Sequence, residues 1–279
     1  MIILLTNDDG YQARGIKILE EVLHKAGHDV WVCAPSDQRS AQSHAMTLKG
    51  KVRIHRYGDR HYHCSGSPAD CILYGLGGNS IPVHPDVVIS GINHGYNAST
   101  DILYSGTVGA ASEGALRGYP SIAVSARSAG EDDLGPFYTG AEFIRDNMEA
   151  LLPICSTDVL VNINVPPRPN GKWRVGKIGQ LQYLDVVEKN ASQQNTNFDA
   201  AHTQIGLAYS DAPFDEVKVG GEVSLSLNTE VFPELREKMG EADFALLEEG
   251  FISVSPIKVN PVVDEESCAA LEKILGEGR

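Results

Sequence analysis

The 279-residue sequence has no long hydrophobic segment and comparatively few basic residues. No stretch approaches the ~18 apolar residues of a membrane span, so we expect no membrane partner. The 23 Lys and Arg are outnumbered by 37 Asp and Glu, for a formal charge of −14. This balance excludes a protein that coats nucleic-acid polymers, because such partners require a dense basic surface. It does not exclude a small anionic substrate, since a metal ion can supply positive potential locally.

Cysteine is scarce and forms no CxxC pair. The five residues are scattered along the chain, at Cys33, Cys64, Cys71, Cys155 and Cys268. Cys64 and Cys71 could bind a metal with His61 and His63, but zinc sites usually have tighter paired spacing. The first ten residues, MIILLTNDDG, are too short and acidic for a secretory signal, so we expect a cytoplasmic protein.

The common phosphate-binding motifs are also absent. The sequence contains neither GxxxxGK followed by Ser or Thr nor GxGxxG. These absences exclude a P-loop enzyme and an ordinary dinucleotide-binding protein.

The hydrophobic pattern up to Pro166 predicts one α/β domain. A buried strand at 1–6, a helix over about 16–26 and a second strand at 29–34 form a βαβ unit. Three further strands are predicted at 86–90, 121–126 and 159–165, alternating with helices at 68–76, 107–117 and 138–151. The fold class is therefore α/β, with a Rossmann-like three-layer sheet and right-handed crossovers.

Residues 51–57 and 61–65 interrupt this alternation as a predicted half-exposed hairpin. Its neighbourhood is the most basic part of the chain, with Lys49, Lys51, Arg53, Arg56 and Arg60. A solvated strand face is the simpler interpretation, and attraction of an anionic substrate is the alternative.

The last third, residues 167–279, has a different pattern. Strands are predicted within 173–179, 217–229 and 251–259, joined by long loops, and a helix at 264–275. We divide the chain into an α/β catalytic core at 1–166 and a β-rich extension at 167–279. The extension, with a β-hairpin and the terminal helix, is expected to pack on the core and to exchange with a partner subunit.

Oxygen-bearing residues follow several predicted strands. In open α/β sheets, ligands bind at the carboxyl ends of the strands. Four loops of the sequence lie at that edge: Asn7–Gly10, Ser36–Ala41, Ser90–Asn97 and Leu103–Thr107.

Asp8 and Asp9 are adjacent carboxylates that repel each other when desolvated, and a shared cation relieves that repulsion. With the Ser40 hydroxyl and the Asn93 amide they form an oxygen-donor set that suits Mg²⁺, Mn²⁺ or Ca²⁺. Taken alone, an Asp-Asp pair is more often a loop or helix-capping feature.

Ser105, Gly106 and Thr107 immediately precede or open a predicted helix. Free backbone N–H groups and the helix dipole favour an anion there, and Gly allows close approach. The same residues could form a plain N-cap.

These residues resemble the survival protein E (SurE) nucleotidase family. The match covers Asn7-Asp8-Asp9-Gly10, Arg39-Ser40-Ala41, Ser90-Gly91-Ile92-Asn93 and Tyr104-Ser105-Gly106-Thr107-Val108, in order. Weaker similarity continues through 161–166 and 250–256. Ser255, where the family more often has Thr, and the loop at 183–205 depart from the pattern.

The resemblance implies a divalent-metal-dependent phosphomonoesterase acting on nucleoside 5'- and 3'-monophosphates, with some activity on short polyphosphate. It implies one metal ion, Mg²⁺ or Mn²⁺, on Asp8, Asp9, Ser40 and Asn93. It implies phosphate binding by Asn97, Ser105, Gly106 and Thr107, and a homodimer or homotetramer.

We interpret Asp8 and Asp9 as the catalytic residues, either of which could accept the proton of the attacking water. His94 is a weaker candidate for the acid that protonates the leaving group. The main alternative function is a non-catalytic, metal-dependent nucleotide or phosphate sensor. A receiver-type signalling domain is disfavoured, because such a domain has about half this length.

Overall fold

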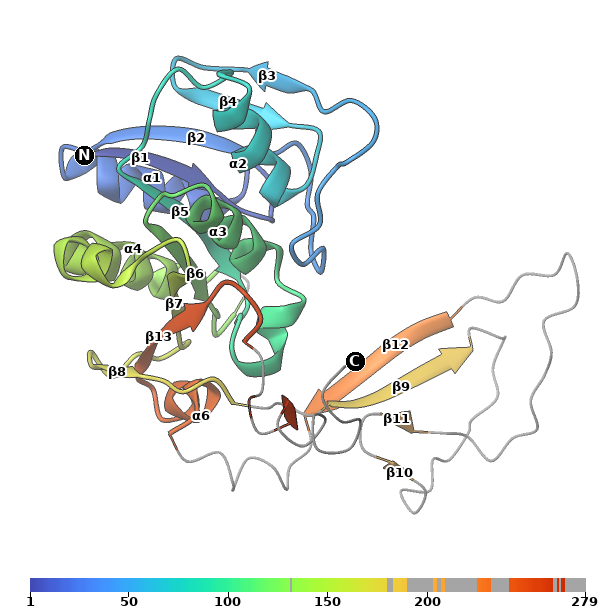
Figure 1. Ribbon diagram of the computed structural model, residues 1–279. Coiled ribbons are helices and arrows are strands. Elements are labelled where there is room, and N and C mark those ends of the chain that lie inside the picture. The colour runs from blue at the N-terminus through green and yellow to red at the C-terminus, as the bar shows by residue number, and fades with distance from the viewer. Residues whose placement is uncertain are drawn as a thin grey trace, which may run out of the picture.

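The computed structural model describes residues 1–130, 132–179 and 241–262, the strands at 183–189, 203–204, 207–208 and 225–231, and residues 265 and 267–268. Within these ranges the chain forms a nine-stranded sheet flanked by helices, and a separate four-stranded sheet (Figure 1).

The nine-stranded sheet has the order β3-β4-β2-β1-β5-β6-β7-β13-β8. Its central strands are β1 (Ile2–Thr6), β2 (Asp29–Pro35), β4 (His61–Cys64), β5 (Val87–His94), β6 (Ser121–Ala126) and β7 (Val159–Val165). These six run parallel, which places their carboxyl ends at one edge. At the two margins β3 (Ile54–Arg56) pairs antiparallel with β4, and β13 (Ile252–Lys258) pairs antiparallel with β7. The last strand, β8 (Trp173–Val175), runs parallel to β13.

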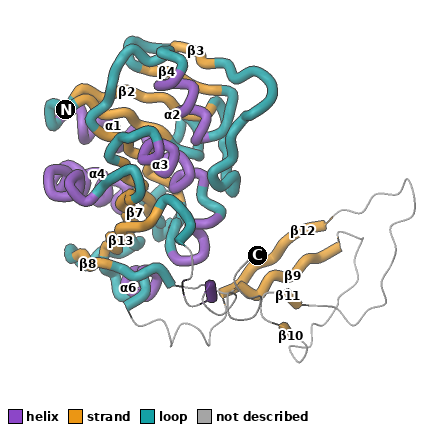
Figure 2. The backbone as a smooth tube through the Cα atoms, viewed as in Figure 1, coloured by secondary structure: helices purple, strands orange, loops and turns teal. Residues whose placement is uncertain are grey.

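Helices cover both faces of the sheet (Figure 2). They are α1 (Arg14–Lys25), α2 (Pro68–Gly77), α3 (Gly106–Leu116) and α4 (Gly135–Leu151). Strand β1 shows how alternation divides the core: Ile3 and Leu5 pack with α1 and α4, whereas Leu4 packs with α2. α3 lies beside α2 on that second face. Burial on both faces explains why the parallel strands are almost continuously apolar.

The crossover through α4 has the opposite hand to the crossovers through α1, α2 and α3. The connections β5–α3–β6 and β6–α4–β7 step in the same direction across the sheet. They pass over opposite faces, because α4 lies with α1 and α3 with α2. The expectation that every crossover is right-handed is therefore wrong for one connection.

The predicted elements of residues 1–166 are otherwise confirmed. The main difference is at β5. The predicted strand ends at residue 90, but β5 continues to His94, so Asn93 lies in the sheet and not in a loop. The predicted hairpin consists of β3 and β4, and β4 joins the sheet beside β2. The Gly91–Ile92 peptide bond within β5 is cis.

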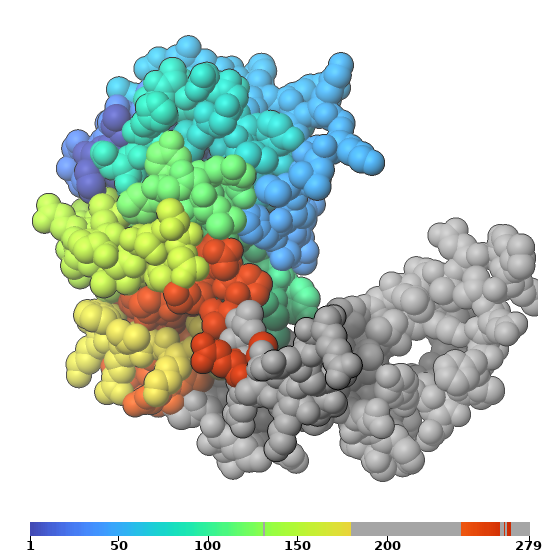
Figure 3. Space-filling view, viewed as in Figure 1, coloured from blue at the N-terminus to red at the C-terminus, as the bar shows by residue number. Residues whose placement is uncertain are grey.

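The extension contributes to both sheets. Figure 3 shows residues 241–262 packed against the core, where β13 lengthens the main sheet and α6 (Asp243–Glu248) precedes it. The smaller sheet contains β9 (Tyr183–Lys189), β10 (Thr203–Gln204), β11 (Leu207–Ala208) and β12 (Leu225–Val231). Of the helix predicted at 264–275, residues 265, 267 and 268 are described and are helical, and the rest lies outside the described residues. The division of the chain at Pro166 stays a prediction.

Among the helices that the structure describes, none is both long and apolar enough to cross a bilayer.

Candidate functional site

The loops that the sequence assigns to one sheet edge meet around Asp8 and Asp9. Asp8 Oδ1 accepts a hydrogen bond from Thr107 Oγ1 at 2.5 Å, and its carbonyl oxygen accepts one from Arg39 N at 2.7 Å. Asp9 Oδ2 accepts from His94 N at 3.1 Å. The ends of β1, β2 and β5 and the start of α3 are therefore in direct contact.

Gly106 lets α3 approach Asp8 closely. A Cβ atom at position 106 would lie 2.9 Å from Asp8 Cβ and 3.0 Å from Asp8 Oδ2, distances that only glycine avoids. The Asp8 carboxylate consequently lies at the N-terminus of α3, where the helix dipole favours negative charge.

Burial controls the ionisation of this carboxylate pair. Asp8 is only 4% exposed. Burial raises the pKa of Asp8 to about 6, the hydrogen bond from Thr107 opposes the rise, and the charge of Asp9 adds to it. Burial also raises the pKa of Asp9, against the effect of the His94 N–H. Two desolvated carboxyl groups side by side are a place where a divalent cation would be stabilised.

The other two predicted metal ligands lie next to residues that touch the pair. Ser40 is exposed and follows Arg39, and its hydroxyl accepts from Gln38 Nε2 at 3.1 Å. Asn93 precedes His94 and donates its amide N–H to Gly95 O at 3.0 Å, which leaves its amide oxygen for a cation. Binding of one ion by all four residues stays a prediction.

The residues present fit a hard divalent ion. Carboxylate, hydroxyl and amide oxygens are the donors that such an ion prefers, and the pKa of both carboxyl groups is raised because burial disfavours the charged forms, which a bound cation would stabilise. Within the described ranges, no group of three or more His, Cys, Asp or Glu side chains could hold a metal. The alternative of a metal on Cys64 and Cys71 with neighbouring histidines is therefore not supported.

Asn97 lies in the loop after β5 and is held by residues of β6 and β7. Its backbone N–H donates to Asn164 Oδ1 at 2.8 Å, and its carbonyl oxygen accepts from Asn162 Nδ2 at 2.8 Å and Asn164 Nδ2 at 3.0 Å. Its side-chain amide donates to Ser125 Oγ at 2.7 Å. All four residues are buried. This clamp fixes the main chain of Asn97, while contact of its side chain with phosphate stays a prediction.

Sequence reasoning missed Asn162 and Asn164, although a signal was present. Both lie in β7, whose other residues are apolar, and buried polar groups require partners. Two buried asparagines at alternate positions of a strand face the same side of the sheet. The pattern therefore indicated that a loop crosses β7 on that side.

At the start of α3 the structure distinguishes Ser105 from Thr107. Ser105 is the N-cap, since its Oγ accepts from Val108 N at 3.0 Å, and its hydroxyl hydrogen is the group it can present to a ligand. Thr107 instead directs its hydroxyl hydrogen to Asp8. The capping and phosphate-binding interpretations of Ser105 are thus compatible.

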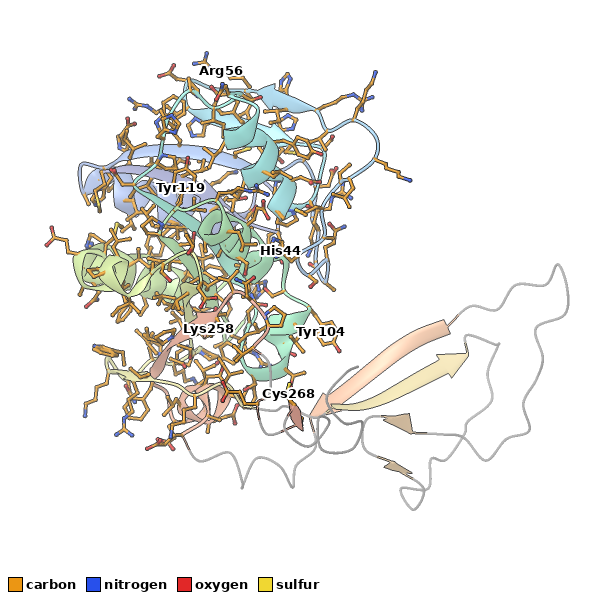
Figure 4. All side chains as sticks on the ribbon, in the orientation of Figure 1. His44, Arg56, Tyr104, Tyr119, Lys258 and Cys268 are labelled. Carbon is orange, nitrogen blue, oxygen red and sulfur yellow. The ribbon has the colours of Figure 1, made fainter. Side chains whose placement is uncertain are left out.

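The loop that follows Ser40 is fixed on α3 (Figure 4). His44 Nε2 contacts Glu113 Oε2 at 2.8 Å, and Ser43 N and Oγ donate to the carbonyls of Tyr104 and Leu103. A Cβ at Gly109 would lie 2.4 Å from Ser43 O, so glycine is required for this contact. These contacts hold the loop after β2 against α3 and the residues that precede it.

The extension also holds the loop after β5 in place. Asp243, the first residue of α6, is fully buried and accepts hydrogen bonds from the backbone N–H and the hydroxyl of Ser99. Ser99 lies two residues after Asn97, in the 3-10 helix Ser99–Leu103. Sequence reasoning did not single out Asp243, because it is one of several acidic residues around a short apolar run and carries no distinguishing local signal.

His94 is not directed towards α3. Its ring lies 5.9 Å from the ring of Phe137, in the first turn of α4 on the opposite face of the sheet. This placement gives no support to His94 as the acid for a leaving group bound at α3.

Comparison with known proteins identifies the family of this chain. The family model described as "Survival protein SurE" matches residues 3–185. The 5'-nucleotidase SurE of Desulfitobacterium hafniense is 39% identical over 263 residues, 92% of this chain and 90% of that protein. The 5'-nucleotidase SurE of Anaeromyxobacter dehalogenans is 43% identical over 190 residues, 68% of this chain and 73% of that protein.

The crystal structure of the SurE protein from Aquifex aeolicus has the same fold, with a TM-score of 0.74 and 28% identity over 99% of this chain and 100% of that one. The α/β architecture with its mixed sheet is thereby confirmed. The range matched by the family model contains the carboxylate pair, the Asn97 clamp and the start of α3. This chain therefore belongs to the survival protein SurE family.

Proposed function

We propose that this protein is a hydrolase that converts nucleoside 5'-monophosphates into nucleoside and phosphate. The observation that carries the proposal is the pair of Asp8 and Asp9, desolvated and adjacent at the N-terminus of α3. Several relatives that carry the name 5'-nucleotidase SurE support it.

The start of α3 would bind the phosphate. The Gly106 N–H and the Ser105 hydroxyl lie at the N-terminus of α3, and helix N-termini commonly bind anions. Thr107 acts differently, by holding Asp8 in place. Asn97, fixed by Asn162 and Asn164, would offer its side-chain amide to another phosphate oxygen.

One divalent ion, Mg²⁺ or Mn²⁺, would be held by Asp8, Asp9, Ser40 and Asn93. When bound, the ion would supply positive charge that polarises the phosphoryl group and stabilises the transition state. Without it, the carboxylates would repel an anionic substrate, as would the net charge of the chain.

During hydrolysis, the oxygen of a water molecule forms a bond to phosphorus and the ester P–O bond breaks. The water loses a proton and the departing nucleoside oxygen gains one. Asp9 is the better placed proton acceptor, because it is half-buried while Asp8 is almost fully buried and held by Thr107. Asp9 Oδ2 is bonded to His94 N, so Oδ1 is the atom that would take the proton.

Phosphate release from AMP in the presence of Mg²⁺ or Mn²⁺, and then with EDTA, tests the proposal. We expect turnover that EDTA abolishes and that Asp8→Asn and Asp9→Asn each reduce at least about 100-fold. Asp146→Asn, an exposed substitution on α4, is the matched control and should retain wild-type activity. Metal-dependent AMP binding without turnover would favour the sensor, and unchanged activity under EDTA would contradict the metal role.

The finer specificity is part of the same proposal. We expect activity on 3'-monophosphates and on short polyphosphate, and action in the cytoplasm, from the family resemblance. Assays with 3'-AMP and tripolyphosphate, and cell fractionation, test these points separately from the 5' activity.

We further propose a homodimer or homotetramer in which the extension is exchanged. The smaller sheet stands apart from the main sheet (Figure 1), and its long strand pair, β9 with β12, would have marginal stability without further packing. Strand β8 also exposes Trp173 and Val175 at the sheet margin. Light scattering coupled to size exclusion should give twice or four times the 30.1 kDa chain mass, and a monomer would contradict the proposal.

A further inference from the structure

A cavity of about 430 Å³ lies beside the candidate site, at the carboxyl ends of β5, β6 and β7. Core and extension both contribute to its wall: Tyr96, Arg127, Pro167, Arg168, Leu247 and Glu248. This volume is within the range of small-molecule sites. A cavity between two parts of a chain is a common position for such a site.

One wall of the cavity is an aromatic and cationic platform. The guanidinium carbon of Arg127 lies 5.6 Å from the centre of the Tyr96 ring. Phe244 contacts the same ring edge-on, at 6.2 Å between centroids, and is itself buried. Tyr96 therefore has a fixed orientation, and a planar guanidinium above an aromatic ring is a surface on which a flat heteroaromatic ring can stack.

The rest of the wall combines apolar and charged groups. Pro167 and Leu247 provide apolar area, while Arg168 and Glu248 provide a donor and an acceptor. A nucleobase has the matching properties, namely apolar faces and an edge of hydrogen-bond donors and acceptors. A second phosphate group would need only the arginines and would leave the apolar wall unused.

The cavity begins one residue from the predicted phosphate site. Tyr96 directly precedes Asn97, so their Cα atoms are about 3.8 Å apart. The loops after the three strands are joined by Gly95 N to Ala126 O at 2.9 Å and Arg127 N to Val165 O at 3.1 Å. On the β2 side, Ser43 is bonded to Leu103 and Tyr104. The side towards Tyr96 leads directly into the cavity, so a nucleoside attached to the bound phosphate can extend in this direction.

We propose that this cavity binds the nucleoside part of the substrate, with the base stacked on the Tyr96–Arg127 platform and its polar edge facing Arg168 and Glu248. This inference rests on the proposed hydrolysis of nucleoside monophosphates. It makes α6 of the extension part of substrate recognition, through Leu247 and Glu248.

The test compares AMP with glycerol phosphate, a phosphate monoester that has no base. For Tyr96→Ala and Arg127→Met we expect kcat/KM on AMP to fall about 10- to 100-fold, mainly through KM, because stacking on the base is lost. On glycerol phosphate the fall should stay below about threefold. Tyr96→Phe keeps the ring and should resemble wild type. Arg145→Met, an exposed arginine on α4, is the control for loss of a positive charge.

Equal losses on AMP and glycerol phosphate would overturn the inference, because the residues would then support the fold or the catalytic loop. If the wild-type protein hydrolyses neither compound, the proposed function fails, and equilibrium dialysis with AMP decides the inference alone. Weaker AMP binding by both Tyr96→Ala and Arg127→Met would support the cavity, and unchanged binding would overturn it.

Discussion

Asn164 and Asn97 form a reciprocal pair: the side chain of Asn164 accepts from the Asn97 N–H at 2.8 Å and donates to the Asn97 carbonyl at 3.0 Å. The loop after β5 is thereby fixed to β7, two strands away in the sheet. A loop held in this way presents its side chains in one orientation, which favours binding and catalysis.

Asn164→Ala should therefore reduce activity more than its distance from the carboxylates suggests. The buried Asn97 N–H loses its acceptor, while the Asn97 carbonyl keeps its bond from Asn162, so we expect a cost of about 1–3 kcal/mol in the free energy of unfolding. We expect kcat on AMP to fall about 100-fold through displacement of Asn97. Asn147→Ala, on α4, removes a side-chain bond to Phe143 O and is the matched control. Loss of stability in Asn164→Ala with unchanged kcat would show that the pair serves only the fold.

Gly106→Ala should separate Asp8 from the start of α3. The added methyl group would meet Asp8 Cβ at 2.9 Å, so either the helix or the carboxylate must move. We expect kcat/KM to fall at least about 100-fold and stability by about 1–3 kcal/mol. Gly77→Ala, at the end of α2, has no atom within 4 Å of the new Cβ and should be nearly silent in both measurements. Wild-type activity in Gly106→Ala would contradict the close-contact role.

Glu113 makes stability depend on pH. Burial acts to raise its pKa, but hydrogen bonds from His44 and Arg117 bring it below the ordinary value of 4.5. A pKa that is lowered in the folded state contributes stability above pH 4.5, and this contribution disappears as pH falls through the lowered value. Glu113→Gln should thus unfold about 1–3 kcal/mol more easily than wild type at pH 7, and the difference should shrink towards pH 4 and below.

Urea unfolding at several pH values measures this dependence. Glu142→Gln, whose side chain is more than half exposed and lies 3.9 Å from Arg145, is the control and should differ little from wild type at any pH. A stability difference for Glu113→Gln that stays constant from pH 7 to pH 4 would contradict the assigned role of its charge.

Asp243→Ala should disturb the site from the extension. Its carboxylate accepts both donors of Ser99, and its removal leaves these donors buried without a partner. We expect a loss of about 2–4 kcal/mol in stability and a fall in kcat of at least about tenfold. Glu241→Ala, two residues earlier, removes an exposed pair with Lys177 and should change neither quantity measurably. An unchanged kcat in Asp243→Ala would mean that the extension does not position the loop.

Local sequence patterns predicted most of the core. Runs such as Ile2–Thr6 and Val159–Val165 are apolar because both faces of the sheet are covered, and this pattern depends on nearest neighbours in the chain. The exceptional crossover through α4 could not be predicted, because the periodicity of a helix records which of its faces is buried and not which face of the sheet it covers.

The sequence by itself determined the α/β alternation and the residue types of the candidate site. Asp8, Asp9 and the start of α3 are adjacent to strand ends, and parallel strands bring such ends to one edge. Only the tertiary structure decided which groups hold that edge in place. Asn164, Glu113 and Asp243 reach their partners across 67, 69 and 144 residues of sequence. Contacts at such separations depend on packing of distant elements, so no local pattern specifies them.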